Sequence, residues 1–146
     1  MEKLIKLLHN GNYSCVVENF DEVFTFTGKG VSDLYDMVKN KPCFLQNARI
    51  ADKVIGKGAA ALMILGGVKE IYADVISLSA LMLLREAGLD ADFRQIVPFI
   101  WNRDKTDWCP LERICYNETS AKAILPLIDE FIINIKQEQL TPAPIL

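Results

Sequence analysis

Hydrophobic and polar residues follow different periods along the chain, and the N-terminal part predicts a helix followed by a β-hairpin. The apolar spacing in residues 1–9 is that of an amphipathic helix, which Asn10-Gly11-Asn12 would end. Residues 14–18 and 23–27 are rich in β-branched and aromatic side chains. The short polar segment 19–22 between them favours a tight turn, so we expect two antiparallel strands.

Two further helices are predicted in the middle of the chain. A short amphipathic helix is expected over residues 32–39. Asp52 is a suitable N-cap for the next helix, over residues 53–65, which is apolar nearly all round. A surface helix would show a polar side, so we expect this helix to be covered, with Gly56 and Gly58 allowing close approach to a sheet.

The next segments alternate between strand and helix. Residues 68–76 and 93–100 predict two strands, and a helix over residues 77–87, capped by Ser77, lies between them. A strand–helix–strand sequence of this length connects parallel strands through a right-handed crossover. Together with the hairpin, it predicts a mixed sheet with helices on both faces.

The C-terminal part is predicted to contain a polar loop and a last helix. One helical turn is expected at residues 110–115, inside the loop 101–117. The last helix would begin at Ser120, and Pro126 would either kink it or restart it.

The length and composition indicate one globular domain. The chain has 146 residues, of which 51% are hydrophobic and 24% charged, and this suits a single hydrophobic core. We expect a core over about residues 10–138 and a flexible tail over residues 139–146. The net charge of −3, without any run of basic residues, gives no reason to expect a nucleic-acid partner.

No membrane partner is expected either. The longest apolar run, Ala59 to Leu65, is much shorter than the roughly 20 residues of a membrane-spanning helix. The N-terminus is too polar for a secretion signal, which predicts a cytoplasmic location and free thiols at the four cysteines. Cys109 and Cys115 are spaced more widely than the cysteines of a zinc knuckle.

Four short segments form a distinctive set: residues 51–60 (ADKVIGKGAA), 67–73 (GVKEIYA), 102–103 (NR) and 109–112 (CPLE). Together they resemble a small prokaryotic family related to the cytidine-deaminase-like superfamily. The order of helix, hairpin, helix, strand, helix and strand is also the core order of that superfamily. The resemblance implies a three-layer α/β/α sandwich with a mixed sheet. It implies no activity, because none is established for the family.

The zinc site of the superfamily's enzymes has no counterpart in this sequence. Those enzymes place His/Cys-x-Glu and Pro-Cys-x-x-Cys at the starts of two core helices. The corresponding positions here are 52–54 and 77–80, and they contain neither Cys nor His. His9, the only histidine, lies in the first helix. We therefore expect no zinc and no other cofactor.

Asp52, Lys53 and Lys57 are the first candidate ligand-binding residues. In the predicted helix, Lys53 and Lys57 lie four residues apart and share one face near the helix start, where free N–H groups and the helix dipole favour anions. The functional interpretation is a site for phosphate, carboxylate or a nucleotide. The alternative is that both lysines extend to solvent at the helix edge and that Asp52 is only a cap.

Four more candidates follow the two predicted parallel strands. Ser77 and Ser79 come after the first strand, and Asn102 and Arg103 come after the second, so all should lie at the carboxyl edge of the sheet, where ligands bind in open α/β folds. Ser77 could equally be a plain helix cap. Arg103 could bind a carboxylate or phosphate, or could form an ion pair within its own loop.

Cys109 and Glu112 suggest a different chemistry. A cysteine at the start of a helical turn can have a lowered pKa and act as a nucleophile, with Glu112 as general base. The alternative is a buried cysteine followed by a capping glutamate.

Three hypotheses about function follow from these residues. The first is a non-zinc, deaminase-like domain that binds a small anionic or nucleotide-like molecule. The second is an enzyme with Cys109 as nucleophile. The third is a non-catalytic regulatory or assembly module, because the apolar helices permit a homodimer as well as burial within one chain.

Overall fold

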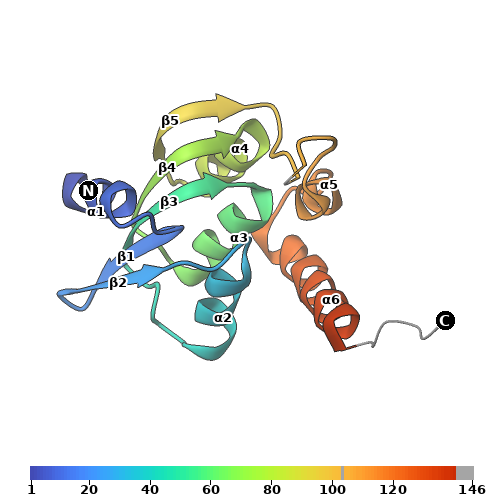
Figure 1. Cartoon of the computed structure of the whole chain (residues 1–146), viewed down its shortest axis with the longest axis horizontal. Coiled ribbons are helices and arrows are strands. Elements are labelled where there is room, and N and C mark those ends of the chain that lie inside the picture. The colour runs from blue at the N-terminus through green and yellow to red at the C-terminus, as the bar shows by residue number, and fades with distance from the viewer. Residues whose placement is uncertain (103, 141–146) are drawn as a thin grey trace.

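The computed structural model describes residues 1–102 and 104–140, and the fold is a five-stranded mixed sheet with helices packed against it (Figure 1). Arg103 and most of the expected tail lie outside the described residues. The strands have the spatial order β2-β1-β3-β4-β5. The elements are α1 (Glu2–Asn10), β1 (Cys15–Asn19), β2 (Glu22–Phe26), α2 (Ser32–Asn40), β3 (Arg49–Ile55), α3 (Lys57–Gly66), β4 (Glu70–Ser77), α4 (Leu78–Glu86), β5 (Ala91–Val97), α5 (Pro110–Cys115) and α6 (Ala121–Leu140).

The predicted hairpin is confirmed. β1 and β2 pair antiparallel, with Asn19 opposite Glu22, and β1 also pairs antiparallel with β3 in the same sheet. The two turn residues, Phe20 and Asp21, have φ values of 53° and 61°. Positive φ at both central positions matches the twist of the flanking strands.

The prediction of a helix from residue 53 is wrong, because residues 49–55 form β3, the central strand. β3 pairs antiparallel with β1 and parallel with β4. The following helix, α3, begins at Lys57, with Gly56 as its N-cap. Asp52 therefore lies inside a strand and caps no helix. Asp52 followed by Lys53 has the residue types of a helix start, which explains the wrong prediction. In a strand, such neighbouring side chains point to opposite faces of the sheet.

The predicted strand–helix–strand unit of residues 68–100 is confirmed as β4-α4-β5, with parallel pairing of the two strands. β4 pairs parallel with both β3 and β5, and Ser77 caps α4 by accepting a hydrogen bond from the Ala80 N–H at 3.2 Å. β5 begins at Ala91 and ends at Val97, so it is shifted toward the N-terminus relative to the predicted strand. Its residues 92–96 are exposed.

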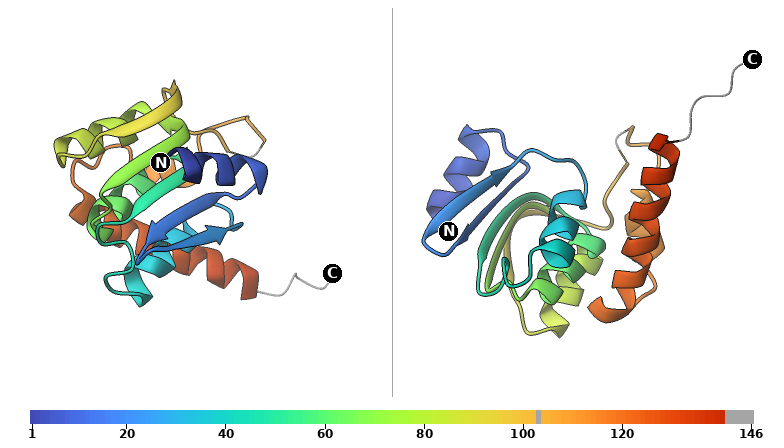
Figure 2. Two further views of the ribbon diagram at one scale, coloured as in Figure 1. Left: turned by 90° about the vertical axis from the view of Figure 1, so that its left-hand side faces the viewer. Right: turned by 90° about the horizontal axis from the view of Figure 1, so that it is seen from below.

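The two faces of the sheet are covered unequally (Figure 2). α1 packs on one face, where its Leu4 and Leu8 contact Val16, Ala51 and Tyr72. The larger core lies on the other face and includes side chains from α2, α3 and α4. α3 is the centre of this core, and its residues 57–63 are all buried.

The last helix, α6, packs against α3 and α5. α6 contains Pro126 within one continuous helical segment, and its Ile124, Ile128 and Ile132 are buried in the larger core. No helix among the described residues is long and apolar enough to cross a membrane.

Candidate functional site

A pocket of about 320 Å³ opens where β3 ends and α3 begins. Gly56 allows this tight junction, because a Cβ there would lie 3.1 Å from Oε2 of Glu112 and 3.3 Å from Cγ1 of Ile100. The walls of the pocket come from five separate parts of the chain: Ser14, residues 28–31, residues 52–54, residues 56–59, and Ile100 with Cys109, Leu111 and Glu112.

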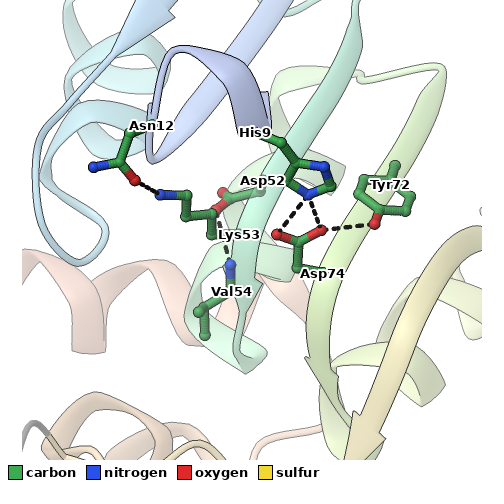
Figure 3. A network of polar contacts seen from close by, with 7 residues as sticks. All are labelled: His9, Asn12, Asp52, Lys53, Val54, Tyr72 and Asp74. Carbon is green, nitrogen blue, oxygen red and sulfur yellow. Dashed lines mark hydrogen bonds and ion pairs between the residues drawn. The ribbon is translucent and has the colours of Figure 1, made fainter. Parts of the chain in front are cut away.

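Asp52 provides a buried carboxyl group in the wall of this pocket. Its side chain is 9% exposed, and Oδ1 accepts a hydrogen bond from the Val54 N–H at 3.2 Å (Figure 3). Burial, with a smaller contribution from the carboxylates of Asp74 and Asp33, raises the pKa of Asp52 from 3.8 to about 7. The backbone N–H groups of Val54 and Lys53 oppose this shift. At neutral pH the group can thus exist in both its protonated and its ionised form.

Glu112 holds the starts of two helices together behind the pocket. Its carboxylate is 2% exposed. Oε1 accepts hydrogen bonds from the Lys57 N–H at 3.1 Å, the Ser77 hydroxyl at 3.2 Å and the Ser79 hydroxyl at 3.1 Å. Oε2 accepts one from the Ile100 N–H at 2.9 Å. The carboxylate thereby bonds to the first residue of α3 and to the cap and first turn of α4.

The prediction that Lys53 and Lys57 share one helix face is wrong. Lys53 lies in β3, and its Nζ donates to Oδ1 of Asn12 at 2.6 Å, beside the end of α1 (Figure 3). Lys57 is 7% exposed, and its Nζ donates to the carbonyl of Tyr116 at 2.8 Å. Both residues line the pocket, but their ammonium groups lie with different partners.

The face of the sheet below α1 carries a separate polar network. His9 Nε2 lies 2.8 Å and 3.0 Å from the two oxygens of Asp74, and the Tyr72 hydroxyl donates to Asp74 at 2.6 Å (Figure 3). Burial, together with this bond to Asp74, raises the pKa of Tyr72 to about 12. The contact attaches α1 to β4, and it gives His9 a partner that the sequence did not indicate.

Ser77 and Ser79 lie together, but neither lines the first pocket. Both hydroxyls bond to Glu112, and Ser77 is fully buried. Ser79 instead lines a second pocket of about 300 Å³, between α4 and Tyr116. The two serines therefore support the site through Glu112.

Asn102 bonds within its own loop. Its amide donates to the Thr106 hydroxyl at 3.1 Å, and its side-chain oxygen accepts the Thr106 N–H at 3.0 Å. It lines none of the pockets described above. The prediction for Arg103 falls outside the described residues.

Cys109 is half-buried and lines the first pocket. It is the residue before α5, but the four hydrogen bonds of Glu112 come from other groups, so no described bond joins the proposed nucleophile to its proposed base. Cys115 is fully buried, and burial, with Glu112 nearby, raises the pKa of its thiol to about 11.

Sequence reasoning missed the loop of residues 28–31 as part of the site. This loop follows β2 and contributes Lys29 and Val31 to the pocket wall. In the sequence, Gly28-Lys29-Gly30 directly follows the predicted strand 23–27. A basic residue between two glycines is compatible with an anion-binding loop, and this was the available signal. Among residues 1–102 and 104–140, no group of three or more His, Cys, Asp or Glu side chains could hold a metal ion.

Both the sequence and the arrangement of strands and helices have known relatives. Residues 3–132 match the family described as TM1506, a domain of unknown function (DUF1893). The chain belongs to the DUF1893 family. The structure of this DUF1893 chain is also similar to the crystal structure of the family protein TM1506 from Thermotoga maritima, with a TM-score of 0.81 and 22% sequence identity. That match covers 88% of this chain and 87% of the other. No curated protein sequence matches.

Proposed function

We propose that this DUF1893 domain binds a small nucleotide-like molecule in the 320 Å³ pocket, on a deaminase-like scaffold that uses no zinc. The observation that carries the proposal is the carboxyl group of Asp52. It is buried in the pocket wall and has a pKa of about 7. A carboxyl group in that position is costly unless it has a partner, and the described protein offers it only backbone N–H groups.

The chemistry of Asp52 fits the polar edge of a nucleobase. A protonated carboxyl group donates one hydrogen bond and accepts another, and an ionised one accepts two. A heteroaromatic ring with adjacent amino and ring-nitrogen groups presents both kinds of partner. Apolar side chains of the same pocket, Val31, Val54, Ile100 and Leu111, would contact the faces of such a ring.

The other end of the pocket can accept an anion. The first N–H groups of a helix have no partner within the helix. Glu112 takes that of Lys57, while Gly58 and Ala59 line the pocket. Lys29 adds a positive charge from the facing loop. A molecule with a base at one end and a phosphate or carboxylate at the other would use both parts of the site.

The position of Glu112 supports the scaffold part of the proposal. In the cytidine-deaminase-like superfamily, the starts of two core helices face each other across the zinc ion. Here the starts of α3 and α4 both donate hydrogen bonds to the Glu112 carboxylate. A negative side chain would thus occupy the place that the resemblance assigns to the metal. The three layers would be α1, the sheet, and α2 to α4, with α6 packed outside.

Binding assays with a matched control test this proposal. Isothermal titration and thermal shift would compare nucleobases, nucleosides, nucleoside monophosphates and inorganic phosphate on the wild type, Asp52→Asn and Asp36→Asn. Asp36 is an exposed carboxylate on α2, so its change should leave binding unaltered. Asp52→Asn should weaken nucleotide binding about tenfold or more, since a bond to a buried charged group contributes about 1.5–3 kcal/mol.

A second variant separates the two ends of the ligand. Lys29→Met should weaken the binding of nucleotides and leave nucleosides unaffected, because in this proposal Lys29 pairs with the anionic group of the ligand. Equal affinity of the wild type and Asp52→Asn for every compound would refute the proposal. So would stabilisation by inorganic phosphate alone.

A further inference from the structure

The outer edge of β5 is open along the whole strand. β5 pairs with β4 on one side, and no described strand pairs with its other side. The five residues 92–96 are all exposed, with Phe93 at 37% and Ile96 at 42%. Soluble proteins usually protect such an edge, because its free N–H and C=O groups can pair with another strand.

The sheet's opposite edge differs from β5. There, Val23, Phe24 and Phe26 of β2 are half-buried, and the ring of Phe24 packs against that of Phe44 at 4.9 Å between centroids. The side chains of β2 are thus more buried than those of β5, which are exposed at the centre of the strand.

We propose that β5 pairs antiparallel with β5 of a second copy of this chain, around a twofold axis that passes through Phe93. In this register, Asp92 of each copy lies opposite Arg94 of the other. Among the described residues, neither side chain has a hydrogen bond or ion pair within its own chain, and the one electrostatic interaction is that of Arg94 with Tyr72. Both charges can therefore pair with a second copy. The pairing would make one sheet continuous across the two copies.

The charges select this register over its neighbours. In a twofold antiparallel pairing, a given residue lies on the same face of the sheet in both copies, and directly opposite residues share a face. The twofold axis must therefore pass through a residue and not between two residues. An axis at Asp92 would place Asp92 opposite itself, and an axis at Arg94 would place Arg94 opposite itself, and like charges directly opposite are destabilising. Only the axis at Phe93 produces two opposite-charge pairs.

Phe93 adds apolar contact at the centre of the interface. Its partner across β4 is Ala73, which is fully buried in the larger core, so Phe93 projects toward the face that α4 covers. In the pair, the two Phe93 rings would lie opposite each other and bury the part of each ring that is exposed in one chain. Aromatic cross-strand pairs are among the favourable ones.

Sedimentation or light scattering over a range of protein concentrations tests the proposal. The wild type should be in monomer–dimer equilibrium. Asp92→Arg and Arg94→Asp should each raise the dimer dissociation constant about tenfold or more, because each places like charges opposite one another. The double variant, D92R with R94D, restores opposite charges and should restore the dimer. It has the same composition and net charge as the wild type, so rescue depends on the register.

Cross-linking at the axis gives an independent test. A Phe93→Cys variant, made with Cys43→Ser to remove the exposed thiol, should form a disulfide-linked dimer under mild oxidation, since directly opposite Cβ atoms are close enough. Gln95→Cys in the same background should cross-link far less, because position 95 would face position 91. A wild type that is monomeric at all concentrations would overturn the proposal, as would a dimer that both single charge reversals leave intact.

Discussion

Glu112 and Lys57 are 55 residues apart in the chain, yet the Glu112 carboxylate accepts the backbone N–H of Lys57 at 3.1 Å in a buried position. The bond attaches α5 to the start of α3. It also replaces the usual side-chain cap of a helix, because Gly56, the N-cap of α3, has no side chain to offer. The Glu112 carboxylate, from α5, thus accepts a backbone N–H at the start of α3 that no local side chain accepts.

Replacing Glu112 should therefore reduce the free energy of unfolding more than replacing an exposed polar residue does. Glu112→Gln keeps the shape of the side chain but exchanges one acceptor oxygen for a donor group that faces N–H and O–H donors. A buried donor that loses its acceptor costs about 1–3 kcal/mol. Urea denaturation would measure the free energy of unfolding, with Glu130→Gln, at an exposed position of α6, as the control. An unchanged free energy in Glu112→Gln would show that these bonds contribute nothing to the fold.

Gly58 should be required for the contact between α3 and α5. A Cβ at position 58 would lie 2.7 Å from Cδ2 of Leu111, and Leu111 is 5% exposed. Alanine favours helix by about 1 kcal/mol over glycine, but overpacking costs about 1–3 kcal/mol. We expect Gly58→Ala to be destabilising in the wild type.

A double-mutant cycle checks that assignment. Leu111→Ala alone should destabilise the protein by about 2–5 kcal/mol, because it removes a buried side chain. In that background Gly58→Ala should become neutral or stabilising, since the clash is gone and the helix propensity remains. The same loss from Gly58→Ala in both backgrounds would place the cause elsewhere than at Leu111.

The fold was predictable wherever local signals agreed with each other. Ser77 has the residue type of a helix cap and follows a β-rich run, and it does cap α4. Residues 49–55 gave conflicting signals, because Asp52 and Lys53 lie in the middle of what became β3. Polar residues are accommodated there because Asp52 faces a pocket and Lys53 reaches Asn12. Neither partner can be known from the local sequence.

Several residues that line the pocket were named from the sequence by their type, but their geometry was not predictable. Asp52, Lys57, Cys109 and Glu112 do come together around one pocket. The expected pairing of Lys53 with Lys57 depended on a helix that is a strand. The role of Glu112 depends on contacts with Ser77 and Ile100, which are long-range and have no periodic signature.

The four thiols should differ clearly in their reactivity. Cys43 is exposed, Cys109 is half-buried, and Cys15 and Cys115 are buried. Burial, with the Asp52 and Asp33 carboxylates nearby, raises the pKa of Cys15 well above its usual value. Because the thiolate is the reactive form, native labelling followed by peptide mass analysis should modify Cys43 first, then Cys109, and leave Cys15 and Cys115 unmodified. Equal protection of Cys109 and Cys15 would remove the case for a catalytic thiol at position 109.

Asp52 should make the protein less stable as the pH rises from about 4 to about 7. Burial raises the pKa of Asp52 from 3.8 to about 7 in the folded state, while the unfolded chain has the ordinary value. Between these two values, the folded protein retains a proton that the unfolded chain has released, so the free energy of unfolding falls with increasing pH. A shift of this size corresponds to roughly 4 kcal/mol, because each unit is about 1.36 kcal/mol.

The Asp52→Asn variant isolates this contribution from other titrating groups. Asparagine has a similar shape and does not ionise, so the variant lacks the penalty of a buried charge. The difference in unfolding free energy between Asp52→Asn and the wild type should grow in favour of the variant from pH 4 to pH 7 and then stay constant. Asp36→Asn, at an exposed carboxylate, should show no such growth. If the difference for Asp52→Asn were flat across this range, Asp52 would have an ordinary pKa in the folded protein, and the pocket would contain a permanently ionised carboxylate instead of one that can donate a hydrogen bond.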